Sequence, residues 1–382
     1  MHLDPTDQQE ILRETARSFM HDKFSKAAIK RMESGDLGYL PEIWKEMAEL
    51  GWMGLPFPEE YGGVGMGFLE LAVLLEEMGK VCPVSPFFST VVLGGLPILQ
   101  AGTDEQKRTY LPGITSGDEL WTLALTESNA RYDAQAIRCR AVPDKDGYRL
   151  NGTKLFVPNA HIAKFMLCVA RIGEITDVVD GIGIYIVETD SPGVRVAVGR
   201  AINNDLLCEV TLDDVRVPAK HVLGPVNNGW QLVERLLEQA AVAKCCEMVG
   251  GARQVLDMTV SYAKERRQFD RPIGSFQAVQ HHCANMAADV DASWLITFEA
   301  AWRISQELPC GTEAAMAKAW VSEACQRVVG LGHQVHGGIG LIDEHDLPRF
   351  TKNAKVGELA FGDARYHWAR LASRLNYGTT SP

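Results

Sequence analysis

The sequence contains no run of about eighteen apolar residues, so no segment is predicted to span a membrane. Its first residues are polar and lack the apolar centre of a signal peptide, which predicts a cytoplasmic protein without a targeting segment. The formal net charge of -11 argues against nucleic acid or an anionic membrane surface as the main partner. The negative charge gives no indication of which other partner the protein binds.

Motifs for disulfides and metals are also missing. None of the nine cysteines forms a C-x-x-C pair, and the adjacent Cys245 and Cys246 point to different sides of a helix. The ten histidines include no H-x-x-x-H pair, and His281 and His282 point apart on a helix. We therefore expect reduced core cysteines and no metal site.

The 382 residues exceed what one small core accommodates, and three regions differ in pattern. Residues 1–120 are predicted to be helical, with Thr6 and Gln9 as a capping box and periodic stretches at 44–50 and 68–78. The sequence GGVGMG at 62–67 is interpreted as a turn, because no strand precedes it and no βαβ unit follows.

Residues 121–225 are predicted to be a small antiparallel β-barrel or sandwich. Short segments rich in Val, Ile and Leu alternate there with turn residues, as in DKDG before YRLNG. The predicted strands are WTLALTE, AIRCRAV, FMLCVARI, GIGIYIVET, VRVAV and LLCEVTL.

Residues 226–382 are predicted to form an antiparallel helical bundle. Residues 230–266 contain no proline, and residues 277–308 contain neither proline nor glycine. One apolar stripe runs from Val279 to Trp294 at three–four spacing. Pro309 should end that helix, and Thr312 should cap a next one that runs to about residue 329. The predicted fold class is mainly α with a β middle domain.

For two polar motifs, the residues alone do not decide between a ligand-binding role and a structural one. ERRQFDRPIGSFQ, at 265–277, places Arg266 and Gln268 beside Phe269, which suits a pyrophosphate and a flat ring but equally an ordinary helix–helix corner. HQVHGGIG, from residue 333, places Gln334 and paired glycines after a helix. It suits close approach of backbone N–H groups to a ligand but equally a helix end with a turn.

Together these segments resemble the acyl-CoA dehydrogenase family. The similarity covers nearly the whole chain and rests on five landmarks in family order: EEYGG, LALTES, GTKLFVPNA, RRQFDRPIGSFQ and QVHGGIG. The resemblance implies a helical N-terminal domain, a β middle domain, a C-terminal four-helix bundle, and FAD. It also implies α,β-desaturation of an acyl-CoA thioester, in which a carboxylate takes the α-proton and a hydride leaves for flavin N5. An electron-transferring flavoprotein then accepts the electrons.

The resemblance also assigns cofactor-binding positions. Leu125 and Thr126 match the segment that meets the flavin ring, and Phe156 matches an aromatic position against the ring, although strand core is the alternative for Phe156. The remaining positions match a subunit-crossing arm and the adenosine contacts; they are Arg266, Gln268, Phe269, Gln277, Gln334, Gly337 and Gly338. Three residues depart from the family pattern: Tyr132 replaces a serine, Pro158 a Ser or Thr that hydrogen-bonds the ring, and Asp270 a glycine.

The usual catalytic base is absent. Its two family positions hold Phe361 and Ala240, neither of which accepts a proton. Glu238 and Glu247 are alternatives as relocated bases, or are solvated or structural carboxylates. The tail resembles a bacterial subgroup that works as two unlike subunits, some acting on CoA thioesters of steroid side chains. We expect an FAD-binding subunit, either paired with such a chain or with itself in a dimer of dimers. The alternatives are a non-catalytic subunit and a flavin oxidase or hydroxylase.

Overall fold

The computed structural model describes residues 5–173, 181–226 and 229–374. By contacts the chain divides into two compact units. The bundle unit comprises Met1–Ser25, Phe68–Pro83 and Ala241–Pro382, and the sheet unit comprises Lys26–Gly67 and Val84–Ala240. This division follows contacts between residues and joins segments that are distant in the sequence. It does not test the three consecutive domains at 1–120, 121–225 and 226–382, which remain a prediction.

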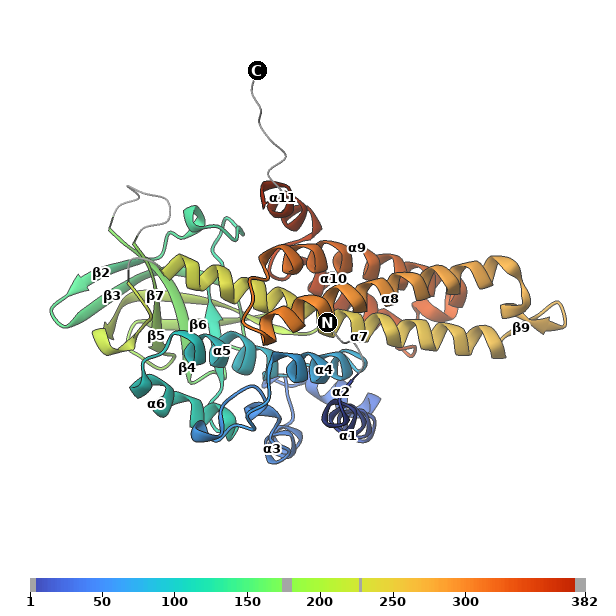
Figure 1. Ribbon diagram of the computed structural model, residues 1–382, viewed down its shortest axis with the longest axis horizontal. Helices are drawn as coiled ribbons and strands as arrows, with labels where there is room; N and C mark the ends of the chain where they lie inside the picture. Colours follow the sequence, from blue (N-terminus) through green and yellow to red (C-terminus); the bar gives the residue numbers. More distant parts are fainter. Residues whose placement is uncertain (1–4, 174–180, 227–228, 375–382) are drawn as a thin grey trace, which may run out of the picture. The chain divides into compact units, whose positions relative to one another are not determined.

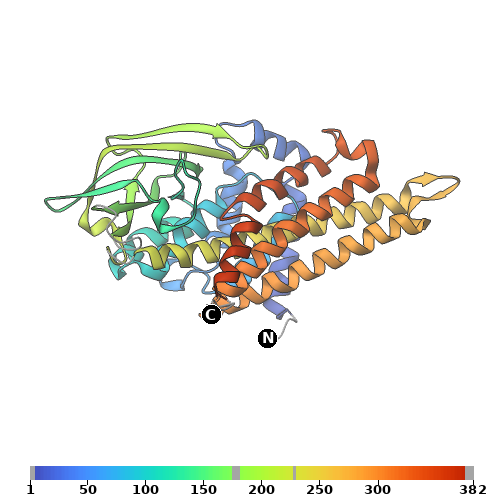
Figure 2. The same cartoon turned by 90° about the horizontal axis from the view of Figure 1, so that it is seen from above.

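The bundle unit is built from long helices. Figures 1 and 2 show α8, α9 and α10 running side by side. Its helices are α1 (Asp7–Lys23), α4 (Phe68–Gly79), α7 from Ala241 onward (whole helix Gly229–Glu265), α8 (Gln277–Ser305), α9 (Gly311–His336), α10 (Leu347–Leu359) and α11 (Ala364–Arg374). A short hairpin of β9 (Arg267–Gln268) and β10 (Arg271–Pro272) joins α7 to α8.

Local sequence signals explain most of these helices. The capping box of α1 is confirmed, because the Thr6 Oγ1 accepts from the Gln9 N–H and the Gln9 side chain accepts from the Thr6 N–H. Met286 and Val290, on the predicted stripe of α8, are fully buried. Helices α4 and α7 approach so closely that a Cβ on Gly79 would lie 2.0 Å from the Glu247 carbonyl oxygen. Small residues at this crossing therefore set the packing distance.

Three predicted helix boundaries were wrong. Helix α8 ends at Ser305, before Pro309, because Glu307 adopts a left-handed φ of 53°. The N-cap of α9 is Cys310, so Thr312 already lies in the first turn and does not cap it. The same helix continues to His336 rather than ending near residue 329, because its apolar face stays buried along the last turns.

The sheet unit combines short helices with one sheet of eight strands (Figure 1). Besides short 3-10 turns and the part of α7 up to Ala240, its helical elements are α2 (Lys26–Ser34), α3 (Pro41–Glu49), a π-helix (Phe88–Gly95), α5 (Leu96–Ala101) and α6 (Asp104–Thr115). Its strands are β1 (Trp121–Ala124), β2 (Arg140–Asp144), β3 (Gly147–Pro158), β4 (Phe165–Ile172), β5 (Ile182–Glu188), β6 (Val194–Arg200), β7 (Leu206–Pro218) and β8 (Val222–Leu223). Each of the six predicted strands overlaps an observed strand, although AIRCRAV does so only in its last three residues, 140–142. Strands β3 and β8 were not predicted as strands.

The strand order is β6-β7-β3-β2-β4-β5-β8, and β1 pairs with β4. Both β1 and β2 run parallel to β4, and the other pairs are antiparallel. The described strands form an open path rather than the closed barrel that was one of the two expected forms. The glycine-rich segment at 62–67 is a turn, as predicted, with positive φ at Gly62 and Gly65.

The described cysteines are all free thiols, and seven of the nine are buried. Within the described ranges, no group of three or more His, Cys, Asp or Glu side chains is arranged to hold a metal ion. The described helices include none that is both long enough and apolar enough to cross a membrane.

Candidate functional site

In the sheet unit, the first candidate segment is the chain that leaves β1. Leu125 is buried and Thr126 is half-buried. The Thr126 carbonyl accepts a hydrogen bond from the Leu155 N–H at 2.8 Å, which ties this segment to β3. The two family-matched segments, LALTES and GTKLFVPNA, are therefore neighbours in space although about thirty residues separate them.

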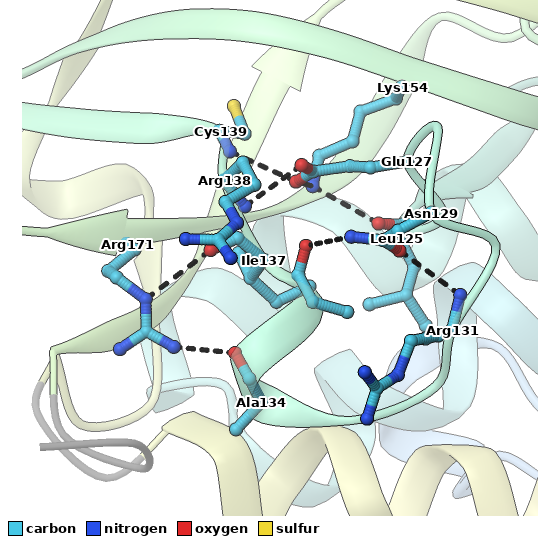
Figure 3. A network of polar contacts seen from close by, with 11 residues as sticks. Leu125, Glu127, Asn129, Arg131, Ala134, Ile137, Arg138, Cys139, Lys154 and Arg171 are labelled. Atoms are coloured by element: carbon cyan, nitrogen blue, oxygen red, sulfur yellow. Dashed lines mark hydrogen bonds and ion pairs between the residues drawn. The ribbon is translucent and has the colours of Figure 1, made fainter. Parts of the chain in front are cut away.

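A buried ion pair fixes this neighbourhood (Figure 3). The Lys154 Nζ lies 2.7 Å from the Glu127 Oε1 and donates to the Leu125 carbonyl at 3.1 Å. The Glu127 carboxylate also accepts from the backbone N–H groups of Arg138 and Cys139, at 2.8 and 3.0 Å. Both charges are thus paired and hydrogen-bonded, which is the condition under which a buried ion pair is tolerated. The pair holds the Leu125 backbone in place.

The loop that follows is braced by further polar contacts (Figure 3). The Asn129 side chain donates to the Ala136 carbonyl at 2.7 Å, and the buried Arg171 donates to the Ala134 carbonyl at 2.5 Å. Tyr132 is half-buried on this braced loop. The loop therefore has a defined shape where the sequence shows only a run of polar residues.

Phe156 lies on an irregular part of β3 and is not core. The register of β3 against β7 shifts between Lys154 and Val157, and Phe156 has a left-handed φ of 56°. Its side chain is 60% exposed, although its neighbour Val157 is buried. The alternative of a strand core residue is thus wrong. A β-bulge is a common device for turning one side chain away from a sheet.

Pro158 ends the same strand and is half-buried. Its carbonyl accepts from the Thr122 Oγ1 at 2.5 Å, which fastens the end of β3 to β1. The side-chain hydrogen bond that a Ser or Thr would offer here is absent from proline, as the sequence implies.

In the bundle unit, Gln268 and Phe269 lie on the β9–β10 hairpin and Arg266 directly precedes it; all three are exposed. Phe269 and Asp270 form its two-residue turn, with φ of 51° and 60°. The second turn position usually carries glycine, so Asp270 stands where the backbone favours the residue that the family pattern has. The Phe269 ring is 86% exposed at the tip of this hairpin.

The remaining candidate positions also lie in the bundle unit. Gln277 is exposed as the first residue of α8. Gln334 is exposed but lies inside α9, not after the helix as expected, because α9 extends to His336. Gly337 caps that helix with a φ of 61°, and a Cβ built on Gly337 or Gly338 would meet nothing within 4 Å. The backbone at these glycines is open to close approach by a ligand.

Neither position of the usual base carries a proton acceptor in its side chain. Ala240 is fully buried in α7, and Phe361 is half-buried after α10. Glu247 forms an ion pair with Lys244 on its own helix, which favours a structural role. Glu238 is half-buried.

Sequence reasoning missed three charged residues that shape these segments: Glu127, Lys154 and Lys318. Glu127 and Lys154 lie inside the two matched motifs but carried no separate signal. Lys318 interrupts an alanine-rich helix and is fully buried. A lysine within an otherwise apolar helical face is a signal that sequence analysis can use, because buried lysines need partners.

The exposed side chains suit FAD, which combines a flat ring, a diphosphate and an adenosine. In the sheet unit, the exposed ring of Phe156 suits stacking on a flat ring. Within the bundle unit by itself, the exposed Arg266 suits an anionic phosphate, and the open backbone at Gly337 and Gly338 suits close contact with a ligand. The roles of the individual residues stay predictions.

Known proteins resemble the chain over its whole length. Models of the acyl-CoA dehydrogenase N-terminal, middle and C-terminal domains match residues 6–118, 122–215 and 227–376. The chain is 34% identical over 380 residues to the probable acyl-CoA dehydrogenase YngJ of Bacillus subtilis, covering 98% of this chain and 100% of that relative.

Two solved structures share the fold. A variant of the Tcur3481-Tcur3483 steroid ACAD is 32% identical with a TM-score of 0.88, covering 98% of this chain and 99% of that one. The ChsE4-ChsE5 complex of Mycobacterium tuberculosis contains a chain that is 26% identical with a TM-score of 0.90, and each chain is covered completely. The chain therefore belongs to the acyl-CoA dehydrogenase family, whose members are FAD enzymes.

Proposed function

We propose that this chain is the FAD-binding subunit of an acyl-CoA dehydrogenase and that an unlike partner chain supplies the catalytic base. The reaction is α,β-desaturation of an acyl-CoA thioester. The observation that carries the proposal is the contrast between exposed cofactor-side residues and the phenylalanine at the base position.

The α-proton of a thioester is weakly acidic, so its removal needs a carboxylate within hydrogen-bond reach, held in a dry site. Phe361 offers no such group, whereas its backbone N–H can still polarise a thioester carbonyl. Binding of the substrate and of FAD thus remains possible without proton abstraction by this chain. Bound FAD supplies the acceptor for the hydride that leaves the β-carbon.

Residues of the sheet unit and of the bundle unit have separate roles in this proposal. Leu125, Thr126 and Phe156 contact the flavin ring, and the braced loop with Tyr132 orients that contact. The diphosphate and adenosine contacts come from Arg266, Gln268, Gln277, Gln334, Gly337 and Gly338. Pro158 lies beside the ring without a side-chain donor.

A two-chain assembly has support from similar proteins. One similar structure is a complex of two differently named chains, and another is described as a steroid ACAD. CoA thioesters of steroid side chains are therefore the first substrates to try. We propose an electron-transferring flavoprotein as the electron acceptor.

The exposed β9–β10 hairpin is a second argument for association with a neighbouring subunit. The Phe269 ring at its tip is 86% exposed within one chain, and covering such a ring is favourable. We propose that the hairpin reaches a neighbouring subunit in a dimer of dimers. Mass in solution, measured together with flavin content, tests this proposal, and a monomer that holds FAD tightly would contradict it.

The main test compares the chain alone with the chain plus its partner, under anaerobic conditions with an artificial electron acceptor. The cofactor is first released by heat and identified by mass as FAD. Alone, the chain should be slower by a factor of about 10²–10⁴, the usual loss when a positioned base is missing. The unlike subunit should restore the rate, and removal of that subunit's carboxylate should abolish it.

Two variants of one position sharpen the test. Phe361→Glu offers a carboxylate and should give slight activity in the chain alone, whereas Phe361→Leu offers none and should give no gain. A homo-oligomer of the unaltered chain that turns over an acyl-CoA at an ordinary enzymatic rate would contradict the missing base. Glu238→Gln and Glu247→Gln then identify a relocated carboxylate.

Two other functions are distinguished by the same preparation. A non-catalytic subunit should bind FAD that acyl-CoA never bleaches, even after the partner is added. An oxidase or hydroxylase should consume oxygen when the substrate is present.

A further inference from the structure

Lys318 is fully buried in α9, and among the described residues its Nζ makes no hydrogen bond to a carboxylate. Its Nζ donates to the Ser322 Oγ at 3.0 Å and to the carbonyls of Glu358 and Gly362, both at 2.8 Å. An ammonium group has three N–H donors, and all three find an acceptor here. One side chain thus ties α9 to the end of α10 and to the turn that follows.

His367, on α11, holds the same turn from a second side. Its Nε2 lies 2.9 Å from the Phe361 carbonyl oxygen, and because a carbonyl only accepts, the Nε2 carries the hydrogen. The ring is buried, and its Nδ1 has no partner among the described residues. Lys318 and His367 therefore occupy the carbonyls of Glu358, Phe361 and Gly362 with buried donors.

The turn has an unusual backbone that needs such support. Phe361 has a φ of 56° and Gly362 a φ of 97°. Left-handed geometry is unfavourable for a phenylalanine. A Cβ on Gly362 would lie 2.3 Å from the Tyr366 Cδ1, so a larger residue would have to displace the Tyr366 ring in addition to adopting a φ that favours glycine. The conformation is thus built by its surroundings and not by local preference.

The fixed carbonyls also orient a backbone donor. Because the peptide group is planar and trans, the Gly362 N–H points opposite to the Phe361 carbonyl that His367 holds. Within the described chain, no acceptor receives the Gly362 N–H. A buried backbone donor without an acceptor is rare in folded proteins and suits a ligand oxygen.

We propose that Lys318 and His367 are positioning residues, which lock the Phe361–Gly362 turn so that the Gly362 N–H faces the thioester carbonyl of an acyl-CoA. This inference rests on the proposed function. It explains why a turn that has lost its carboxylate keeps a conformation that the local sequence disfavours. The turn then contributes carbonyl binding, and the base is contributed elsewhere.

The hydrogen bonds from Lys318 and His367 to the turn, called the clamp below, depend on pH through the protonation of Lys318. Burial lowers the pKa of Lys318 to about 8. The ionisable groups that face it are Cys245 from α7, Cys325 from α9, Glu358 from α10, and Asp363 and His367 from the turn and α11. Burial also lowers the pKa of His367 to about 4, so the imidazole is neutral throughout the range in which Lys318 titrates. Neutral Lys318 keeps two N–H donors for three acceptors, so the clamp loosens as the pH rises through 8.

The test measures FAD content and thioester affinity separately in the FAD-loaded protein. The probe is crotonyl-CoA, which is already desaturated, and its dissociation constant is read from the flavin absorption. His367→Leu removes the donor and should weaken binding about tenfold, as expected for the loss of one hydrogen bond. His367→Gln keeps an N–H at a similar reach and should retain most of the affinity. Lys318→Met should weaken binding similarly, and Lys355→Met is the matched control because Lys355 forms only a surface pair with Glu358.

The pH dependence gives a readout that a merely structural role does not predict. Affinity of the unaltered protein should fall between about pH 7 and about pH 9, and this fall should be absent from Lys318→Met. Full FAD content with unchanged affinity in His367→Leu and Lys318→Met would overturn the positioning role. FAD-loaded protein that never responds to crotonyl-CoA would also overturn it. Failure of the unaltered chain to hold FAD would instead overturn the proposed function.

Discussion

Two buried lysines, one in each compact unit, are satisfied in different ways. Lys154 in the sheet unit lies against the Glu127 carboxylate, whereas Lys318 in the bundle unit contacts a hydroxyl and two backbone carbonyls. A paired charge makes each partner depend on the other, because either one alone would be a buried unpaired charge. A lysine held by neutral acceptors leaves only neutral groups behind when it is removed. The two sites therefore predict different costs for the same substitution.

The largest effect is expected at the ion pair. Lys154→Met leaves the Glu127 carboxylate buried without its counter-charge, which should lower the free energy of unfolding by about 3–5 kcal/mol. Urea unfolding of the two proteins measures this difference. Lys164→Met is the control, because the exposed Lys164 pairs with the half-buried Glu119, and such a pair near the surface should contribute little. A loss at Lys154 no larger than at Lys164 would show that the buried pair is not needed.

A smaller effect is expected at Lys318. Lys318→Met removes the donors to the Glu358 and Gly362 carbonyls, and an unsatisfied buried acceptor costs about 1–3 kcal/mol. The loss of a desolvated charge offsets part of this cost. The same urea experiment measures it, and a destabilisation greater than that of Lys154→Met would reverse the comparison.

The pH dependence of stability separates Lys318 further. Its pKa is lowered to about 8 by burial, whereas a lysine in an unfolded chain has a pKa of about 10.4. Between these values the unfolded chain binds more protons, so the Lys318 contribution to the free energy of unfolding rises with pH, by at most about 1.4 kcal/mol per pH unit. Lys318→Met should show a flatter slope than the unaltered protein above pH 8, and Lys355→Met should keep the original slope. Equal slopes in all three proteins would contradict the lowered pKa.

The smallest effect is expected at Phe156, which contacts neither the Lys154 ion pair nor the hydrogen bonds of Lys318. Phe156→Ala should weaken FAD binding by about 0.5–1.5 kcal/mol, the contribution of ring stacking beyond area burial. It should barely change the unfolding of the FAD-free protein, because the ring is 60% exposed. Flavin absorption and FAD titration measure the first quantity, and urea unfolding measures the second. Unaltered FAD affinity would leave Phe156 without a role in binding the cofactor.

Local patterns predicted most secondary structure. The strands rich in Val, Ile and Leu are confirmed, because continuous apolar runs between turn residues favour buried strands. Strand β3 was missed because its residues alternate irregularly between buried and half-buried, and a bulge at Phe156 interrupts the period. The prediction that Thr312 is the N-cap was wrong because α9 already begins at Gly311, with Cys310 as its N-cap.

The candidate site was likewise predicted in part from the sequence and decided in part by the tertiary structure. Family motifs in the sequence indicated Phe156, the hairpin at 266–269 and the glycines at 337 and 338, and they showed that Phe361 replaces the base. They did not show that Phe156 is exposed, which depends on the register between β3 and β7. Nor did they indicate Glu127 and Lys154 as a pair, since 27 residues separate them along the chain.

The sequence by itself determined the family resemblance, the type of most elements and the absence of a carboxylate at the usual base positions. These properties depend on residue identity and on periodicity within a few turns of chain. Only the tertiary structure decided which charges are buried, what each buried lysine contacts, and that His367 and Lys318 converge on the Phe361–Gly362 turn. Burial and hydrogen bonding between α9, α10 and α11 depend on how distant segments pack, and no local pattern encodes that packing.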